Sequence, residues 1–329
     1  MIRISALLVV ILAGLLLFSI GHGDYPMSPG DLLAVLTGSA DADPQIGMIV
    51  FEFRLPRALL ALLTGAALAV AGAIAQAVMR NPLAEPGILG INGGAALAVM
   101  IVLVALDGVP FHLLPWAGFA GAGAMAAAIY ALSWCNGGTS SLRIILIGIG
   151  LSAIAGAATT FLTTFGEIRD VQRAMIWLAG SVYHAEWTGV RDLAFWLAVP
   201  LVLTVMSSRE LDLIHFGDDA AKSLGQRVNL VRGAMIVLCT LLSGAAVAAA
   251  GLIGFVGLIA PHIARRITGP AHIRLIPVSA LIGAILVVVA DLVGRTVIAP
   301  AQLPAGIVTG LIGAPFFAYL LWRPRHEPA

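Results

Sequence analysis

Side chains that could carry chemistry are few in this 329-residue chain, and they do not cluster in the sequence. The seven histidines lack the spacing of metal ligands, and no H-E-x-x-H occurs. No G-x-x-x-x-G-K-[ST] is present, so the chain has no phosphate-binding loop of its own. The two cysteines, Cys135 and Cys239, lie far apart and indicate neither a disulfide nor a metal site. The sequence therefore predicts no catalytic residue, no metal site and no cofactor.

One acid, Asp291, lies within an apolar run, where a charge is costly and is usually functional. Arg295 follows four residues later, at the spacing that pairs opposite charges on a helix. Such a pair would leave no free carboxylate for proton- or sodium-coupled transport. In the alternative interpretation, Arg295 joins Arg54 and Arg57 in a basic rim that meets an acidic partner. The residues alone leave both interpretations open.

The composition is that of a membrane protein. Hydrophobic residues make up 60% of the chain and charged residues 11%, with a mean hydropathy of +1.01. A soluble chain is about 25% charged. The apolar runs are apolar on every side, which favours helices over barrel strands. The net charge of +1 provides no field for binding nucleic acid. We predict an all-α, polytopic membrane protein.

Ten candidate spans can be placed along the chain. The first is kept as a mature helix because no clear cleavage site follows it and later spans continue. The predicted spans are 4–21, 57–79, 93–107, 112–134, 142–165, 190–207, 230–250, 252–267, 275–296 and 303–322.

Lys and Arg placement indicates the orientation. With the N-terminus inside, twelve of the 18 Lys and Arg residues face the cytoplasm, so both termini are predicted to be cytoplasmic. Six fall outside. Three of these, Arg169, Arg173 and Arg191, lie beside acids that can pair with them, which leaves Arg54, Arg57 and Arg295 to be explained.

An internal repeat is suggested by two glycine- and alanine-rich segments. Residues 65–75 match residues 244–254 at seven of eleven positions, at an offset of 179, and Pro82 aligns with Pro261. Transporters are often built from two related halves. We therefore divide the single transmembrane domain, 1–329, into repeat halves of roughly 57–165 and 230–322. Chance similarity between two small-residue helices is the alternative.

The most polar cytoplasmic stretch is 209–229. A short helix is predicted over 219–224, capped by Asp218 or Asp219 and ended by Gly225. A rigid helix standing off the membrane could receive force from a soluble motor. The alternative is an amphipathic loop lying on the headgroups.

Three long segments, 54–94, 251–295 and 302–321, resemble the permeases of iron-chelate and cobalamin importers driven by ATP-binding-cassette ATPases. Within that family, the chain is most similar to a ferric-citrate permease subunit. The resemblance implies a ten-helix subunit in the lipid of the bacterial inner membrane, paired with a second, identical or paralogous permease subunit. Two ATPase subunits holding ATP and Mg would bind inside, and a periplasmic substrate-binding protein would bind outside.

The implied function is import of a ferric chelate, ferric citrate or a siderophore, by alternating access, with no enzyme activity in this chain. Haem or cobalamin import is the alternative, and an ion-coupled secondary carrier is a more distant one. The resemblance also assigns roles to individual residues. Docking of the binding protein falls on Arg54, Arg57 and Arg295. Coupling to the ATPase falls on Leu211, Asp212, Leu213, Gly217, Asp218, Ala221, Leu224 and Gly225. The pathway would pass Thr160, Thr164 and Pro304, beside a short outer helix over 173–187.

Overall fold

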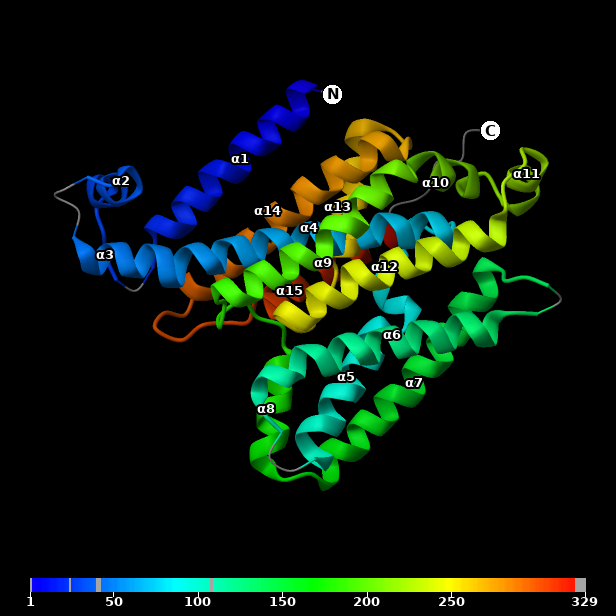
Figure 1. The fold of residues 1–329 in the computed structure, drawn as a ribbon, viewed down its shortest axis with the longest axis horizontal. Helices are drawn as coiled ribbons and strands as arrows, with labels where there is room; N and C mark the ends of the chain where they lie inside the picture. The colour runs from blue at the N-terminus through cyan, green and yellow to red at the C-terminus, as the bar shows by residue number, and fades with distance from the viewer. Residues whose placement is uncertain (1, 24, 40–42, 107–108, 136, 323–329) are drawn as a thin grey trace.

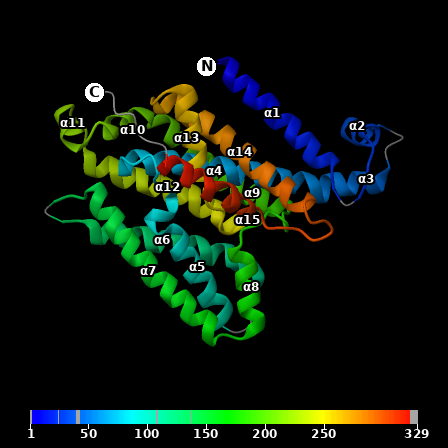
Figure 2. The same ribbon diagram turned by 180° about the vertical axis from the view of Figure 1, so that it is seen from behind.

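The computed structural model describes residues 2–23, 25–39, 43–106, 109–135 and 137–322, and every regular element within them is helical. Figures 1 and 2 show long helices side by side, with α10 and α11 at one end and α2 and α3 at the other. In Figure 2, α1 begins and α15 ends toward the side that carries α10 and α11. Both ends of the described chain therefore lie toward α10 and α11, the side that the sequence predicts to be cytoplasmic.

Within the described residues, eight helical runs are long and apolar enough to cross a membrane. They are α1 (Ile2–Gly21), the run Pro44–Met79, α6 (Leu114–Ser133), α7 (Ser141–Phe165), α9 (Trp187–Met206), α12 (Val228–Ala250), α14 (His272–Thr296) and α15 (Ala305–Trp322). The second run joins α3 (Pro44–Met48), the π-helical turns Ile49–Arg54 and α4 (Leu55–Met79).

The two remaining predicted spans coincide with shorter helices. These are α5 (Ile91–Met100), which π-helical turns extend to Ala105, and α13 (Val256–Thr268). Residue 107, at the end of one predicted span, lies outside the described residues. The short helices outside the spans are α2 (Pro29–Thr37), α8 (Ile168–Leu178), α10 (Ser208–His215) and α11 (Asp218–Ser223).

The two repeated sequences differ in local structure. Residues 65–75 lie wholly within α4, whereas 244–250 form the end of α12, which Gly251 terminates with φ of 70°. Pro82 lies in the loop after α4, but Pro261 lies inside α13. The two matching sequences therefore lie at different positions relative to the ends of their helices.

Helix α4 occupies the centre of the bundle. Every residue from Ala67 to Met79 is buried, and the helix packs against α9, α12, α13 and α14. A Cβ on Gly65 would overlap the Gly283 carbonyl of α14, and one on Gly72 would overlap the Gly257 backbone of α13. Because lipid is as apolar as leucine, helices in membranes associate through such close packing at small residues. Glycine at these two crossings lets α4 approach both neighbours.

We expect Gly72→Ala to separate α4 from α13, since the added methyl group has no space beside Gly257. Overpacking of this kind costs about 1–3 kcal/mol, which should appear as a lower melting temperature of the purified protein in detergent. Gly14→Ala on α1 is the matched control, because no atom lies within 4 Å of its added Cβ. Equal melting temperatures for the two variants would contradict this description of the crossing.

Candidate functional site

A pocket of about 480 Å³ opens at the outer end of the bundle. Its walls come from the start of α4, the end of α14, the loop after α1 and the loop between α8 and α9. Three arginines from distant parts of the sequence, Arg54, Arg57 and Arg295, line this single pocket. The folded chain thus brings together the outer arginines that sequence analysis singled out.

Arg57 is held by side chains on three sides. Its Nε donates to both oxygens of Asp291 at 3.0 and 3.1 Å, and Nη2 donates to Oδ1 at 2.8 Å. Nη1 donates to the Gln302 Oε1 at 2.9 Å, and the guanidinium lies 5.4 Å from the centroid of the Tyr183 ring. The Arg57 side chain is 13% exposed. Bidentate pairing and ring stacking fix the direction of its charge.

Arg54 and Arg295 are more deeply buried, each 8% exposed, and bind main-chain oxygens at the end of α1. Arg54 donates to the carbonyls of Ile20 and Tyr25 at 2.9 and 2.6 Å. Arg295 donates to the carbonyls of Ser19 and His22 at 2.6 and 2.8 Å. The last carbonyls of a helix lack partners within the helix, and cations stabilise them. These two arginines therefore anchor the outer end of α1.

The pairing expected within α14 is present but secondary. The Arg295 Nε lies 3.8 Å from Asp291, whereas Arg57 approaches the same carboxylate to 2.8 Å. Asp291 is thus closed off by two arginines at the outer end of its helix. Three arginines and the acid Glu186 line the pocket, so its lining carries an excess of positive charge.

The short outer helix lies earlier than predicted. The expected range was 173–187, but α8 covers Ile168–Leu178, and residues 179–186 form an irregular segment before α9. Gly180, with φ of 68°, ends the helix in a left-handed turn. Its carbonyl accepts from the Gly306 amide at 2.9 Å, and the next residue, Ser181, donates to the Ala250 carbonyl at 2.7 Å. The irregular segment therefore ties α8 to α12 and α15.

The three predicted pathway residues are not gathered into one site. Thr160 and Thr164 lie on an exposed face of α7, and their hydroxyls donate to the carbonyls of Gly156 and Thr160 at 3.0 and 2.8 Å. Pro304 lies just before α15 and is half-buried. Both hydroxyls donate within their own helix, and each hydroxyl oxygen can still accept a hydrogen bond.

At the inner end, α10 is attached to α14. Asp212 accepts from the backbone amide of His272 at 2.9 Å and lies 2.6 Å from its Nδ1. Leu211 and Ile214, on the same helix, are fully buried. Burial and the nearby Arg265 lower the pKa of His215, the last residue of α10. Helix α10 is thus fixed to the first turn of α14.

Helix α11 is attached to α12 by an ion pair. Arg232 is completely buried; it donates to Asp218 at 2.6 Å and to the Thr139 carbonyl at 2.6 Å. Asp218 was predicted to cap the helix, but Gly217, with φ of 109°, takes the cap position and frees the carboxylate for Arg232. The predicted range of 219–224 becomes Asp218–Ser223, with Gly225 in a left-handed turn after it.

The other side of this hairpin is open. Phe216 and Leu224 are 73% and 66% exposed, whereas Ala221 is buried against the bundle. Leu213 is half-buried. We name the hairpin formed by α10 and α11 the inner lever. Its two large apolar side chains, Phe216 and Leu224, are exposed and not covered by the bundle. Large apolar side chains left exposed in this way are typical of a docking face.

A half-buried acid, Glu85, was missed by sequence analysis. It lies between α4 and α5, and its Oε2 accepts from the Phe255 amide at 3.3 Å; burial raises the pKa of its carboxyl group. Phe255 has φ of 66°, which is uncommon outside glycine, and its ring fills the space beside Gly313 of α15. An acid directly before Pro86 in an otherwise apolar segment was the available signal. Within the described parts of the chain, no cluster of His, Cys, Asp and Glu could hold a metal ion.

Comparisons with known proteins agree with this arrangement. The achromobactin transport system permease protein of Dickeya dadantii is 43% identical over 325 residues, which are 98% of this chain and 92% of that protein. An Fe(3+)-citrate import system permease protein of Bacillus subtilis is 42% identical, covering 96% of this chain and 93% of that protein.

A solved structure, described as an inward-facing conformation of a metal-chelate type ABC transporter, superposes with a TM-score of 0.88. It is 29% identical and covers 98% of this chain and 99% of that one. The pattern of the FecCD transport family matches residues 8–323, nearly the whole of the chain. The resemblance read from the sequence is confirmed: this chain is a multi-pass membrane permease of the FecCD transport family.

Proposed function

We propose that this chain moves a ferric chelate, ferric citrate or a siderophore, from the periplasm to the cytoplasm across the bacterial inner membrane. The observation that carries the proposal is near full-length similarity to permeases whose names specify achromobactin and ferric citrate. The arrangement of the bundle supports the proposal, since the basic outer pocket lies at one end of the helices and the inner lever lies at the other. In this proposal the chain forms one transmembrane domain built from two related halves.

In this proposal, different partners bind at the outer and inner ends of the bundle. A second permease subunit completes the pathway, with α7, α8 and α15 next to it. A periplasmic binding protein docks at the outer pocket through acidic side chains, and Arg57 is the most accessible of the three arginines there. Two ATPase subunits, which carry ATP and Mg, bind the inner lever. Closure of the ATPases would then rock the helices between outward- and inward-open states.

The pairing of Asp291 argues against an ion-coupled carrier. Its carboxylate is held by Arg57 and lies near Arg295, so proton or sodium binding there would have to displace two cations. Glu85, a half-buried acid, accepts a hydrogen bond from the main-chain amide of Phe255. We therefore place the energy source in the ATPase and the coupling in the inner lever.

The cargo is tested by uptake in cells in which the gene is deleted and then restored. We expect deletion to abolish uptake of one radiolabelled ferric chelate among ferric citrate, hydroxamate and catecholate siderophores, and restoration to recover it. Normal uptake of every iron source, with loss of haem or cobalamin uptake instead, would contradict the proposal.

For the outer pocket, we expect Arg57→Gln to weaken docking of the binding protein about tenfold at low salt, close to 1.4 kcal/mol, with less effect at high salt. The exposed Arg191 of α9 supplies the control, Arg191→Gln, which should leave the affinity unchanged. Unchanged affinity in Arg57→Gln would refute docking at this side chain.

Arg54→Gln should instead lower the melting temperature. The substitution leaves two main-chain carbonyls without their hydrogen-bond donor, which costs about 1–3 kcal/mol of folding free energy.

For the inner lever, we expect Asp218→Asn to uncouple hydrolysis from transport. The substitution leaves Arg232 buried without its anionic partner, so α11 loses its attachment to α12. Uptake in reconstituted vesicles should fall severalfold more than ATP hydrolysis does. Asp219→Asn, at the exposed neighbouring position, is the matched control and should behave as wild type. Equal uptake and hydrolysis in the two variants would argue against coupling through α11.

A further inference from the structure

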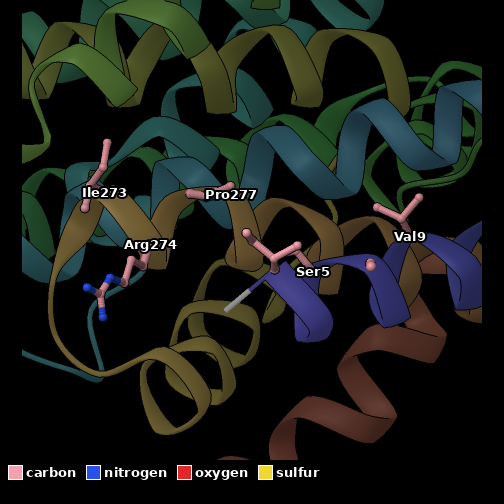
Figure 3. Close-up of a pocket in the computed structure, with 7 residues that line it drawn as sticks. Ser5, Val9, Ile273, Arg274 and Pro277 are labelled. Atoms are coloured by element: carbon pink, nitrogen blue, oxygen red, sulfur yellow. The ribbon is translucent and has the colours of Figure 1, made fainter.

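A second hollow, of about 430 Å³, lies between the first turns of α1 and the first turns of α14. Ser5, Ala6 and Val9 of α1 form one wall, and Ile273, Arg274 and Pro277 of α14 form the other. Figure 3 shows Ser5 and Val9 on α1 opposite the start of α14, with Arg274 at the far end from Val9. We name this hollow the inner groove.

The inner groove exists because the contacts between α1 and α14 begin with small side chains. Ser5 and Ala6 leave space, whereas Leu8, Leu12 and Leu15, further along α1, join the hydrophobic core. The groove is therefore open near the cytoplasm and closes toward the middle of the membrane. Its walls are apolar except at Ser5 and Arg274.

The position of the inner groove in the membrane follows from its neighbours. Its wall on α14 begins at Ile273, directly after His272, which binds the inner lever through Asp212. The first turns of α1 and α14 thus mark the cytoplasmic boundary, where acyl chains meet headgroups. An apolar groove that opens sideways at this level faces lipid.

The charge at the mouth of the inner groove is positive. Arg274 is exposed, and its guanidinium has no hydrogen-bond or ion-pair partner among the described residues; Arg3, beside Ile2 on α1, is also exposed without one. Both helices start here, so the positive ends of their dipoles point to the same place. Arginine binds phosphate well because its donors match the spacing of phosphate oxygens.

We propose that the inner groove binds an anionic phospholipid of the cytoplasmic leaflet, with one acyl chain between α1 and α14 and the headgroup phosphate on Arg274. Arg3 adds to the attraction at the mouth. The site attaches α1, a peripheral helix, to α14, the helix that also holds α10 and Asp291. It depends on neither the identity of the cargo nor the docking of the partners.

The experiment is native mass spectrometry of the purified full-length chain, titrated with phosphatidylglycerol and, separately, with phosphatidylcholine of the same acyl chains. We expect tighter binding of phosphatidylglycerol. Arg274→Gln should weaken it about fivefold, since one basic residue near a membrane surface contributes ~1 kcal/mol to anionic lipid binding. Arg227→Gln, at another exposed arginine near the cytoplasmic start of α12, is the control and should bind as wild type.

Two further measurements separate the parts of the proposal. Ala6→Trp fills the groove and should reduce binding of both lipids, whereas millimolar inorganic phosphate should not compete. Equal affinity for the two lipids, or unchanged phosphatidylglycerol binding in both Arg274→Gln and Ala6→Trp, would overturn the assignment. A change in oligomeric state of Ala6→Trp without loss of bound lipid would assign the groove to a second copy of the chain and also overturn it.

Discussion

The close packing of α4 against α13 and α14 is the contact on which the other features depend. Apolar burial gives little advantage between helices surrounded by lipid, so the bundle is held by crossings at which glycine permits backbone contact. Gly72 on Gly257 and Gly65 on Gly283 are these crossings. With α4 fixed at the centre, its outer start brings Arg54 and Arg57 beside α14, and its inner end leads into the turn that places Glu85 beneath α13.

Polar contacts at the ends of the bundle join elements distant in sequence. Arg57 of α4 forms an ion pair with Asp291 of α14, and Asp218 of α11 forms one with Arg232 of α12. Asp212 of α10 is joined to His272 of α14 by hydrogen bonds. A charge removed from water must be paired, because an unpaired one costs several kcal/mol. Each pair therefore locks a short or peripheral element to a span. A push on the inner lever would reach α12 and α14 directly, which is the property that an ATP-driven permease requires.

The sequence was sufficient for the all-helical membrane fold and the family. Long apolar runs are a strong signal, and all ten predicted spans coincide with helices of the described residues. The sequence did not predict which residues far apart along the chain contact each other. The sequence offered Arg295 as a partner for Asp291 because the two are four residues apart, but Arg57, 234 positions earlier, is the closer partner. The range of α8 was displaced because Gly180, which ends it, lies in an irregular segment that only the packing of α12 and α15 fixes. Glu85 was overlooked for the same reason, since its partner Phe255 lies in the other half.

Whether force from ATP hydrolysis drives this permease is most directly measured by uptake into vesicles that contain the chain with its partner permease, ATPase and binding protein. The account predicts that labelled ferric chelate accumulates only when ATP is present on the ATPase side, and that dissipating proton and sodium gradients has no effect. Accumulation without ATP, abolished when those gradients are dissipated, would contradict it.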